Sequence, residues 1–197
     1  MFILEDPKPI FNWEVVINDV INDEDITLIE KYVVSHPSKL SSANVKNDHN
    51  PNVVDKKVRV TNIMWLDEME PILSVYQKIQ SLIHEVNNNR YKFNISMLEP
   101  LQYSEYPSDQ GGHYDWHYDS FLRHPGNNVR KLSFSLGLND EYEGGELEFF
   151  SSEGDIKYKT GKGKLIMFPS FIPHRINAVT KGVRKSLVGW IHGPNFC

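Results

Sequence analysis

The chain has 197 residues, a formal net charge of −5 and a single cysteine, Cys197. Hydrophobic residues make up 40% of it, which suits a soluble globular fold and is too apolar for a disordered chain. The acidic charge does not indicate electrostatic capture of nucleic acid or membrane. One cysteine excludes an intrachain disulfide and a cysteine-based zinc cluster. No stretch approaches the ~20 apolar residues of a membrane span, and the first residues do not form a signal peptide. We therefore expect a cytoplasmic protein that binds neither nucleic acid nor membrane, and its oligomeric state stays open.

Two segments in the first half of the chain have apolar residues at helical spacing. The first runs from 23 to 36, where Asp23 is a candidate cap and Pro37 stops the helix. The second runs from about 67 to 87, with Pro71 in its first turn, where the missing N–H costs little. We expect both helices to cover one outer face of a sheet.

Short runs of β-forming residues dominate the chain after Arg90. Before them, residues 38–57 are polar and predict a long surface loop, and residues 58–65 predict a strand. Regular turn signals between the later runs are typical of a sandwich or jelly-roll barrel. No helix interrupts them, which argues against a parallel βαβ fold. The runs are 93–97, 113–119, 131–138, 146–150, 156–159, 164–168, 174–179 and 184–192.

The densest cluster of metal-binding residue types is His-Tyr-Asp-Trp-His-Tyr-Asp at 113–119. Residues two apart on a strand share a face, so His113, Asp115, His117 and Asp119 are expected to point the same way. A His-x-Asp pair with a second His forms the two-His-one-carboxylate triad of non-haem Fe(II) oxygenases. The two pairs lie ~13 Å apart along a strand, so one metal ion cannot use both. The spacing does not choose between them, and a polar, half-exposed strand face is the alternative.

The second half of the chain supplies further pieces of a pattern. These pieces are Tyr-Asp-Trp-His-Tyr-Asp (114–119), Leu-Asn-Asp-Glu-Tyr-Glu-Gly-Gly-Glu-Leu (138–147), Phe-Pro-Ser (168–170), Pro-His-Arg (173–175) and Gly-x-Arg-x-Ser-Leu (182–187). In order and spacing they resemble the Fe(II)/2-oxoglutarate-dependent dioxygenases, closest to the prolyl 4-hydroxylase-like branch that includes the PKHD-type hydroxylases. The resemblance covers about residues 94–192.

The resemblance implies a mainly β fold with supporting helices and a double-stranded β-helix core (jelly-roll, cupin-like). We expect one domain over residues 1–197, with helical support and the first strands in 1–92 and the catalytic core in 93–197. The implied activity is hydroxylation of a substrate C–H with Fe(II), O₂ and 2-oxoglutarate, which is decarboxylated to succinate and CO₂. A peptidyl prolyl residue is the first candidate substrate, and ascorbate is a further candidate cofactor.

Two other functions stay open at this point. One is hydroxylation of a free amino acid or small metabolite rather than a peptide or protein. The other is a non-enzymatic, metal-binding barrel of cupin type, which has no need of a buried arginine ten residues beyond its last metal ligand.

Carried over position by position, the resemblance makes His117, Asp119 and His174 the iron ligands. It prefers the second His-x-Asp pair because the family places Tyr-x-x before its first ligand histidine, here Tyr114 and the two residues after it. A third possibility is a different metal-dependent enzyme that uses the first pair.

The resemblance also implies a pocket for 2-oxoglutarate. Arg184 matches the basic residue that holds the distal carboxylate of this cosubstrate, and Ser186 is its partner in the Arg-x-Ser motif. A buried carboxylate needs such a fixed cation, and the planar fork of arginine can bind it bidentately. Tyr106 matches a tyrosine near the cosubstrate, and Trp190 matches an aromatic residue that lines the pocket.

One position departs from the family pattern. Related prolyl hydroxylases often place a second cosubstrate tyrosine where this chain has Gly137, so we expect Tyr103 or Ser133 to supply the missing contact. Residues 120–129 follow the metal pair directly and are either a plain connector or a substrate-covering lid.

Overall fold

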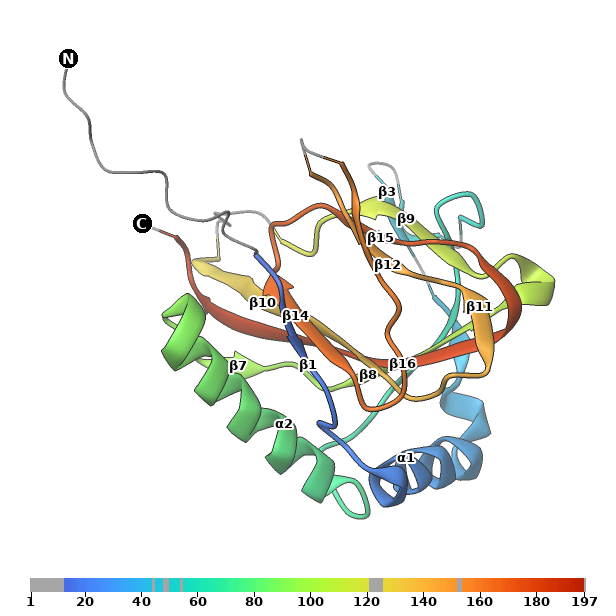
Figure 1. The fold of residues 1–197 in the computed structure, drawn as a ribbon, viewed down its shortest axis with the longest axis horizontal. Coiled ribbons are helices and arrows are strands. Elements are labelled where there is room, and N and C mark those ends of the chain that lie inside the picture. Colours follow the sequence, from blue (N-terminus) through green and yellow to red (C-terminus); the bar gives the residue numbers. More distant parts are fainter. Residues whose placement is uncertain are drawn as a thin grey trace.

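Two antiparallel sheets face each other, and two helices cover the outer side of the larger sheet (Figure 1). The computed structural model describes residues 13–43, 45–47, 50–53, 55–120, 126–151 and 154–196. Parts of the two predicted loops, 38–57 and 120–129, lie outside these residues. The facing sheets form the jelly-roll (double-stranded β-helix) expected from the sequence.

The larger sheet is built around β16, the longest strand. Its order is β1 (Val15–Ile17), β14 (Leu165–Pro169), β10 (Asn128–Gly137), β16 (Val179–Pro194), β8 (Gln102–Pro107), β6 (Asn62–Trp65) and β2 (Ser41–Ser42), and β7 (Met97–Leu98) and β11 (Tyr142–Gly144) also pair with β16. The smaller sheet has the order β13 (Ile156–Tyr158), β12 (Leu147–Phe149), β15 (His174–Ile176), β9 (His113–His117) and β5 (Arg59–Val60). A separate hairpin joins β3 (Val45–Asn47) and β4 (Asn50–Val53), and the short helical turns are η1 (Pro37–Lys39), η2 (Asn87–Tyr91) and η3 (Ser108–Gln110).

Helix α1 (Asp23–Ser35) is capped by Asn22, one residue before the predicted cap Asp23. The side chain of Asn22, not Asp23, accepts the N–H of Asp25 at 3.0 Å, and the Asp25 carboxylate accepts the N–H of Asn22 at 3.0 Å. This reciprocal capping box satisfies two backbone donors of the first turn. The predicted end before Pro37 is confirmed.

Helix α2 (Leu73–Val86) is shorter than predicted, because Pro71 precedes the helix rather than lying in its first turn. A residue before proline is disfavoured in the helical region, so the backbone at Glu70 cannot join the helix. Residues 67–72 instead form turns, with the Met69 N–H donating to the Asp67 carbonyl at 2.9 Å.

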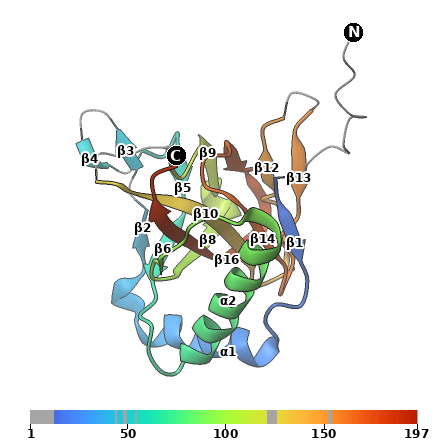
Figure 2. The same ribbon diagram turned by 90° about the vertical axis from the view of Figure 1, so that its left-hand side faces the viewer.

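The larger core lies between the helices and the outer face of the larger sheet (Figure 2). Helical residues such as Ile29 and Ile79 are fully buried against sheet residues such as Leu132 and Phe134. The two helices therefore cover one sheet face, as expected. No helix in the described part of the chain is long and apolar enough to cross a membrane.

Several strands differ from the prediction. Residues 58–65 divide at Thr61, whose hydroxyl donates to the Glu105 carbonyl at 2.7 Å, so β5 and β6 join different sheets. Only the end of 93–97 is a strand. The central strand β8 was not predicted, because Gln102 and Ser104 are polar although both are buried, and this hides the apolar alternation of a strand.

A buried carboxylate lies on the outer face of the smaller sheet. Glu148 is 1% exposed and accepts hydrogen bonds from Arg175 at 2.9 and 3.0 Å and from Asn177 at 2.6 Å. Burial alone would raise the pKa of Glu148, but Arg175 and Asn177 outweigh it and bring the pKa to about 2.

We expect Glu148→Gln to lower the free energy of unfolding by about 1–3 kcal/mol at neutral pH, because it leaves buried donors poorly paired. The difference from wild type should shrink as the pH falls from 4.5 toward 2, since a carboxyl with a lowered folded-state pKa stabilises only while it is ionised. Urea unfolding at several pH values measures this. Glu143→Gln, in an exposed pair with Lys181, should change little. A pH-independent loss for Glu148→Gln would contradict the assignment.

Candidate metal centre and cosubstrate pocket

An irregularity in β9 decides which residues face the space between the sheets. His174 of β15 pairs with His117, and Ile176 pairs with Tyr114, so three steps on β9 match two on β15. The extra residue breaks the alternation of side chains. As a result Tyr114 and His117 lie on the same side, with their rings stacked at 3.6 Å between centroids. The expectation that four alternate residues share a face was wrong.

The alternative metal pair, His113 and Asp115, is not assembled into a site. The ring nitrogens of His113 lie 2.7 Å from the Gly111 carbonyl and 3.2 Å from the Lys57 carbonyl. The Asp115 side chain is exposed and accepts the backbone N–H that follows it. Neither residue belongs to the group of metal-capable side chains found among the described residues.

That group consists of His117, Asp119 and His174, each with a ligand atom within 4.8 Å of the others. The Nε2 atoms of His117 and His174 lie 3.7 and 3.6 Å from the Asp119 carboxylate oxygens. Both Nδ1 atoms instead lie against backbone carbonyls, at 2.7 and 2.9 Å. Donation from Nδ1 to these carbonyls leaves both Nε2 atoms free to accept a metal ion, as in metal-binding histidines.

The charge state of the group also suits a divalent cation. Burial and the neighbouring His174 lower the pKa of His117 to about 3, although Asp119 opposes this. Burial acts to raise the pKa of Asp119, but His174, His117 and a hydrogen bond from Ser133 outweigh it, so the pKa lies below its ordinary value. A neutral imidazole and an ionised carboxylate are the forms that bind metal. The donor set therefore fits Fe(II), with one carboxylate and two histidines.

Two buried serines hold the Asp119 carboxylate in place. The Ser133 hydroxyl donates to Asp119 Oδ2 at 2.7 Å and lies 2.8 Å from the Ser170 hydroxyl. Because Ser133 has one hydrogen to give, Ser170 is the donor in the second bond. The Ser170 carbonyl also accepts the Asp119 N–H at 2.9 Å.

The suggestion that Tyr103 supplies the missing cosubstrate contact was wrong, and the suggestion for Ser133 stays a prediction. The Ser133 hydroxyl is bonded to Asp119. Tyr103 packs in the core beneath the helices, and its hydroxyl donates to Glu105 at 2.7 Å. Neighbouring residues on β8 alternate between faces, so Tyr103 and Tyr106 point to opposite sides of the sheet.

We expect Ser133→Ala to weaken metal binding about 10–100-fold, the usual effect of losing a hydrogen bond to a ligand. Anaerobic titration calorimetry with Fe(II) measures it. Ser135→Ala is the matched control, because Ser135 lies two residues along the same strand and contacts Arg184 rather than Asp119. Equal metal affinity in the Ser133 variant and wild type would remove Ser133 from this role.

The Arg184 guanidinium is enclosed by neutral groups. It is 1% exposed and donates to the hydroxyls of Ser186, Ser135 and Thr160 at 3.0, 3.1 and 2.9 Å. The Tyr106 ring centroid lies 5.2 Å from its Cζ. Its Nε has no partner, and no ion pair to Arg184 is present among the described residues. A buried cation without an anion is costly, so this arrangement fits a ligand carboxylate.

Gly137 explains how Thr160 reaches this position. A Cβ atom at Gly137 would lie 2.2 Å from the Gly161 carbonyl oxygen and 2.5 Å from that of Thr160. A tyrosine there would displace the segment that brings Thr160 to Arg184. Sequence reasoning missed both Ser135 and Thr160; the alternation of strand β10 could have indicated Ser135, but nothing local indicated Thr160.

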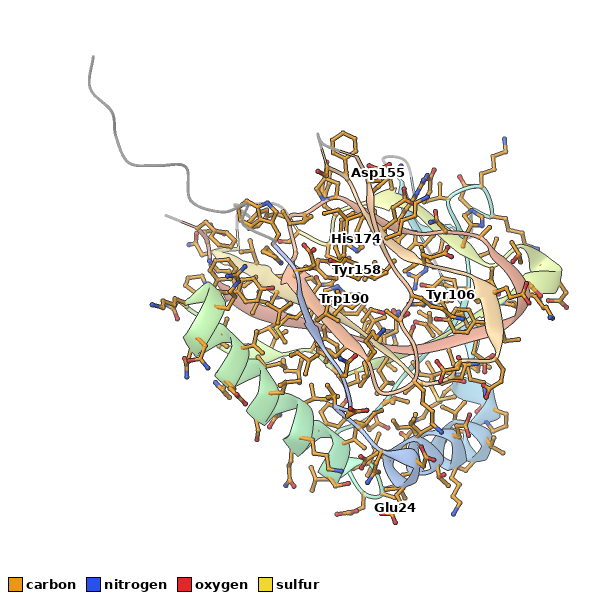
Figure 3. The ribbon with its side chains drawn as sticks, viewed as in Figure 1. Glu24, Tyr106, Asp155, Tyr158, His174 and Trp190 are labelled. Atoms are coloured by element: carbon orange, nitrogen blue, oxygen red, sulfur yellow. The ribbon has the colours of Figure 1, made fainter. Side chains whose placement is uncertain are left out.

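Trp190 is the aromatic residue expected to lie near the metal-capable residues and the Arg184 guanidinium. Figure 3 shows Trp190 on the larger sheet and His174 on the smaller sheet facing the space between them. The Trp190 ring lies 5.8 Å from that of Trp65, and the Arg130 Cζ lies over it at 4.1 Å. Trp190 also pairs across the strands with Ser133, the residue that donates to Asp119.

The sequence profile of the 2OG-Fe(II) oxygenase superfamily matches residues 101–192, the stretch that contains all seven expected site residues. Residues 101–192 are therefore similar to this superfamily. Among curated relatives, the chain is 39% identical over 94 residues to a PKHD-type hydroxylase of Idiomarina loihiensis, covering 44% of the chain and 42% of the relative. It is 37% identical over 98 residues to one of Crocosphaera subtropica, covering 48% and 43%. The matches thus span less than half of these relatives.

The oxygenase fold extends over more of the chain than the sequence matches. A Pseudomonas putida prolyl-4-hydroxylase superposes with a TM-score of 0.70 at 19% identity, covering 94% of both chains. A Trichoplax adhaerens prolyl hydroxylase, in complex with a peptide fragment of hypoxia inducible factor, gives 0.75 at 20% identity, covering 91% of this chain and 83% of that one.

Proposed function

We propose that the protein is an Fe(II)- and 2-oxoglutarate-dependent dioxygenase that hydroxylates a peptidyl prolyl residue and converts 2-oxoglutarate to succinate and CO₂. The observation that carries the proposal is a combination of two features. The first is the donor set of His117, Asp119 and His174, and the second is the buried guanidinium of Arg184, which forms no ion pair with a carboxylate among the described residues. The first fits a metal with open positions. The second fits the distal carboxylate of a dicarboxylic cosubstrate. A non-enzymatic metal-binding barrel would have no need of the buried Arg184 guanidinium.

The residues then take distinct roles. His117, Asp119 and His174 would hold Fe(II), and Arg184 with Ser186, Ser135 and Thr160 would orient the cosubstrate. With 2-oxoglutarate and O₂, the bound iron supplies the oxidising chemistry for C–H hydroxylation.

The apolar wall around His174 supports exclusion of water from this space. The Phe168 ring lies 4.6 Å from the His174 ring and the Phe149 ring lies 6.2 Å from it. Trp190 and Tyr106 would close the wall on the larger sheet. The helices and the strands β1, β2, β5 and β6 come from residues 1–92, which supports one catalytic unit over residues 1–197 with the barrel core in 93–197.

The choice of a prolyl residue is supported by likeness alone, because the solved neighbours are named prolyl hydroxylases and one of them holds a peptide. Proline-containing peptides should be screened with Fe(II), 2-oxoglutarate and O₂. We expect a 16 Da gain on proline with one succinate formed per hydroxylated residue. Succinate formation with hydroxylation of a free amino acid instead would keep the dioxygenase and replace the peptide substrate. Absence of succinate formation with every candidate substrate would contradict the proposed reaction.

A further inference from the structure

A second buried guanidinium lies beside the metal-binding group, and no hydrogen bond in the described residues uses it. Arg59, on edge strand β5, is 9% exposed, and its Nε has no hydrogen-bond partner. The described part of the chain places no carboxylate in an ion pair with it. The aromatic ring of Tyr114 lies against it, with the ring centroid 4.5 Å from the Arg59 Cζ.

The position of Arg59 relative to the metal group follows from that ring. Arg59 pairs with Tyr114 across β5 and β9, so the two side chains lie on the same side of the sheet. The Tyr114 ring in turn stacks on His117 at 3.6 Å and 15°. The Tyr114 ring therefore separates the Arg59 guanidinium from His117, a proposed metal ligand. A small substrate bound at the metal could span this separation and reach Arg59.

Other arginines near the barrel have partners, and this makes Arg59 stand apart. Arg130 donates two bonds of 2.7 and 2.8 Å to Glu99. Arg175 donates two bonds to Glu148. Arg184 donates to three hydroxyls. An arginine whose buried Nε has no partner in the described part of the chain carries a local cost in stability, and such a cost is expected where a ligand later satisfies the group.

We propose that Arg59 binds a carboxylate of the primary substrate. The molecule hydroxylated here then carries a carboxylate close to the carbon that is hydroxylated. The inference rests on the proposed function, since it assigns the substrate class of that same site. The planar guanidinium suits a carboxylate over a neutral amide. The carboxylate comes either from an acidic side chain beside the target residue or from a free C-terminus, and the test separates these sources.

The test measures binding without turnover. Calorimetry on protein loaded with Mn(II) and 2-oxoglutarate, without Fe(II), compares N-acetyl-Pro-Asp-amide with N-acetyl-Pro-Asn-amide, and N-acetylproline with N-acetylprolinamide. We expect the charged member of at least one pair to bind roughly 10–100-fold more tightly, as for hydrogen bonds to charged groups. A preference in the first pair identifies the acidic side chain, and one in the second pair identifies the terminal carboxylate.

Arg59→Met should bring the preferred pair to nearly equal affinities. It should melt at or above the wild-type temperature, because a methionine of similar volume replaces an unpaired buried charge. Lys57→Gln is the matched control: Lys57 is exposed two residues away, and its known contacts are made by its backbone. This variant should keep the preference. Equal binding of both members by wild type, or a preference that survives in Arg59→Met, would overturn the proposal.

A second probe keeps this proposal separate from the choice of proline. If no proline compound binds, thermal shifts with acetate and acetamide are measured on protein whose Arg184 pocket is filled by 2-oxoglutarate. Stabilisation by acetate alone, lost in Arg59→Met, would support the carboxylate site and reject the prolyl substrate. The same shift in wild type and Arg59→Met would reject the carboxylate site.

Discussion

Asp119→Ala is expected to abolish measurable Fe(II) binding, an effect larger than the roughly 10–100-fold cost of losing a residue that only hydrogen-bonds to a ligand. Asp119 supplies the only charge of the donor set, and its removal leaves two neutral imidazoles. Anaerobic calorimetry with Fe(II) gives the affinity. The same variant should also fail to develop the visible charge-transfer band that we expect from wild-type protein loaded with Fe(II) and 2-oxoglutarate.

Asp115→Ala is the matched control for this experiment. Asp115 belongs to the other His-x-Asp pair and is exposed; its side chain accepts the next backbone N–H, and its backbone carbonyl, which contacts His117, is kept in the variant. It should bind Fe(II) like wild type. Loss of binding in Asp115→Ala together with retention in Asp119→Ala would move the metal to the first pair and reverse the assignment.

Arg184→Met is expected to weaken 2-oxoglutarate binding by roughly 100-fold or more, because the distal carboxylate would be buried without a cation. Fe(II) affinity should stay the same, since Arg184 does not contact the donor set among its known partners. Titration of the Fe(II)-loaded protein under anaerobic conditions follows the charge-transfer band. Wild type should also discriminate strongly against 2-oxopentanoate, which lacks the distal carboxylate, and the variant should not.

Lys185→Met provides the control for charge loss at the neighbouring position. Lys185 lies on the opposite face of β16 and pairs with Glu30 of α1 at 2.8 Å. We expect 2-oxoglutarate affinity close to that of wild type. If Arg184→Met kept both the affinity and the discrimination, the cosubstrate pocket would lie elsewhere in the barrel.

Features that depend on residues a few positions apart could be predicted from the amino-acid sequence. The 3.6-residue spacing of apolar side chains located both helices within several residues, and turn residues between short runs indicated the barrel. The motif pieces around His117, His174 and Arg184 were enough to indicate the superfamily. Each of these signals is carried by local backbone periodicity or by a short motif, which a single chain displays without knowledge of its neighbours.

Features that depend on strand register could not be predicted in this way and became visible in the folded chain. One extra residue in β9 relative to β15 placed Tyr114 beside His117 and turned the first His-x-Asp pair away. The close approach allowed by Gly137 brought Thr160 to Arg184 from a loop. Ser133 reached Asp119 from another strand, and Arg59 reached the rim of the site from an edge strand. These contacts join residues 14 to 55 positions apart along the chain, and pairing between distant strands is set by packing of the whole barrel rather than by any local pattern.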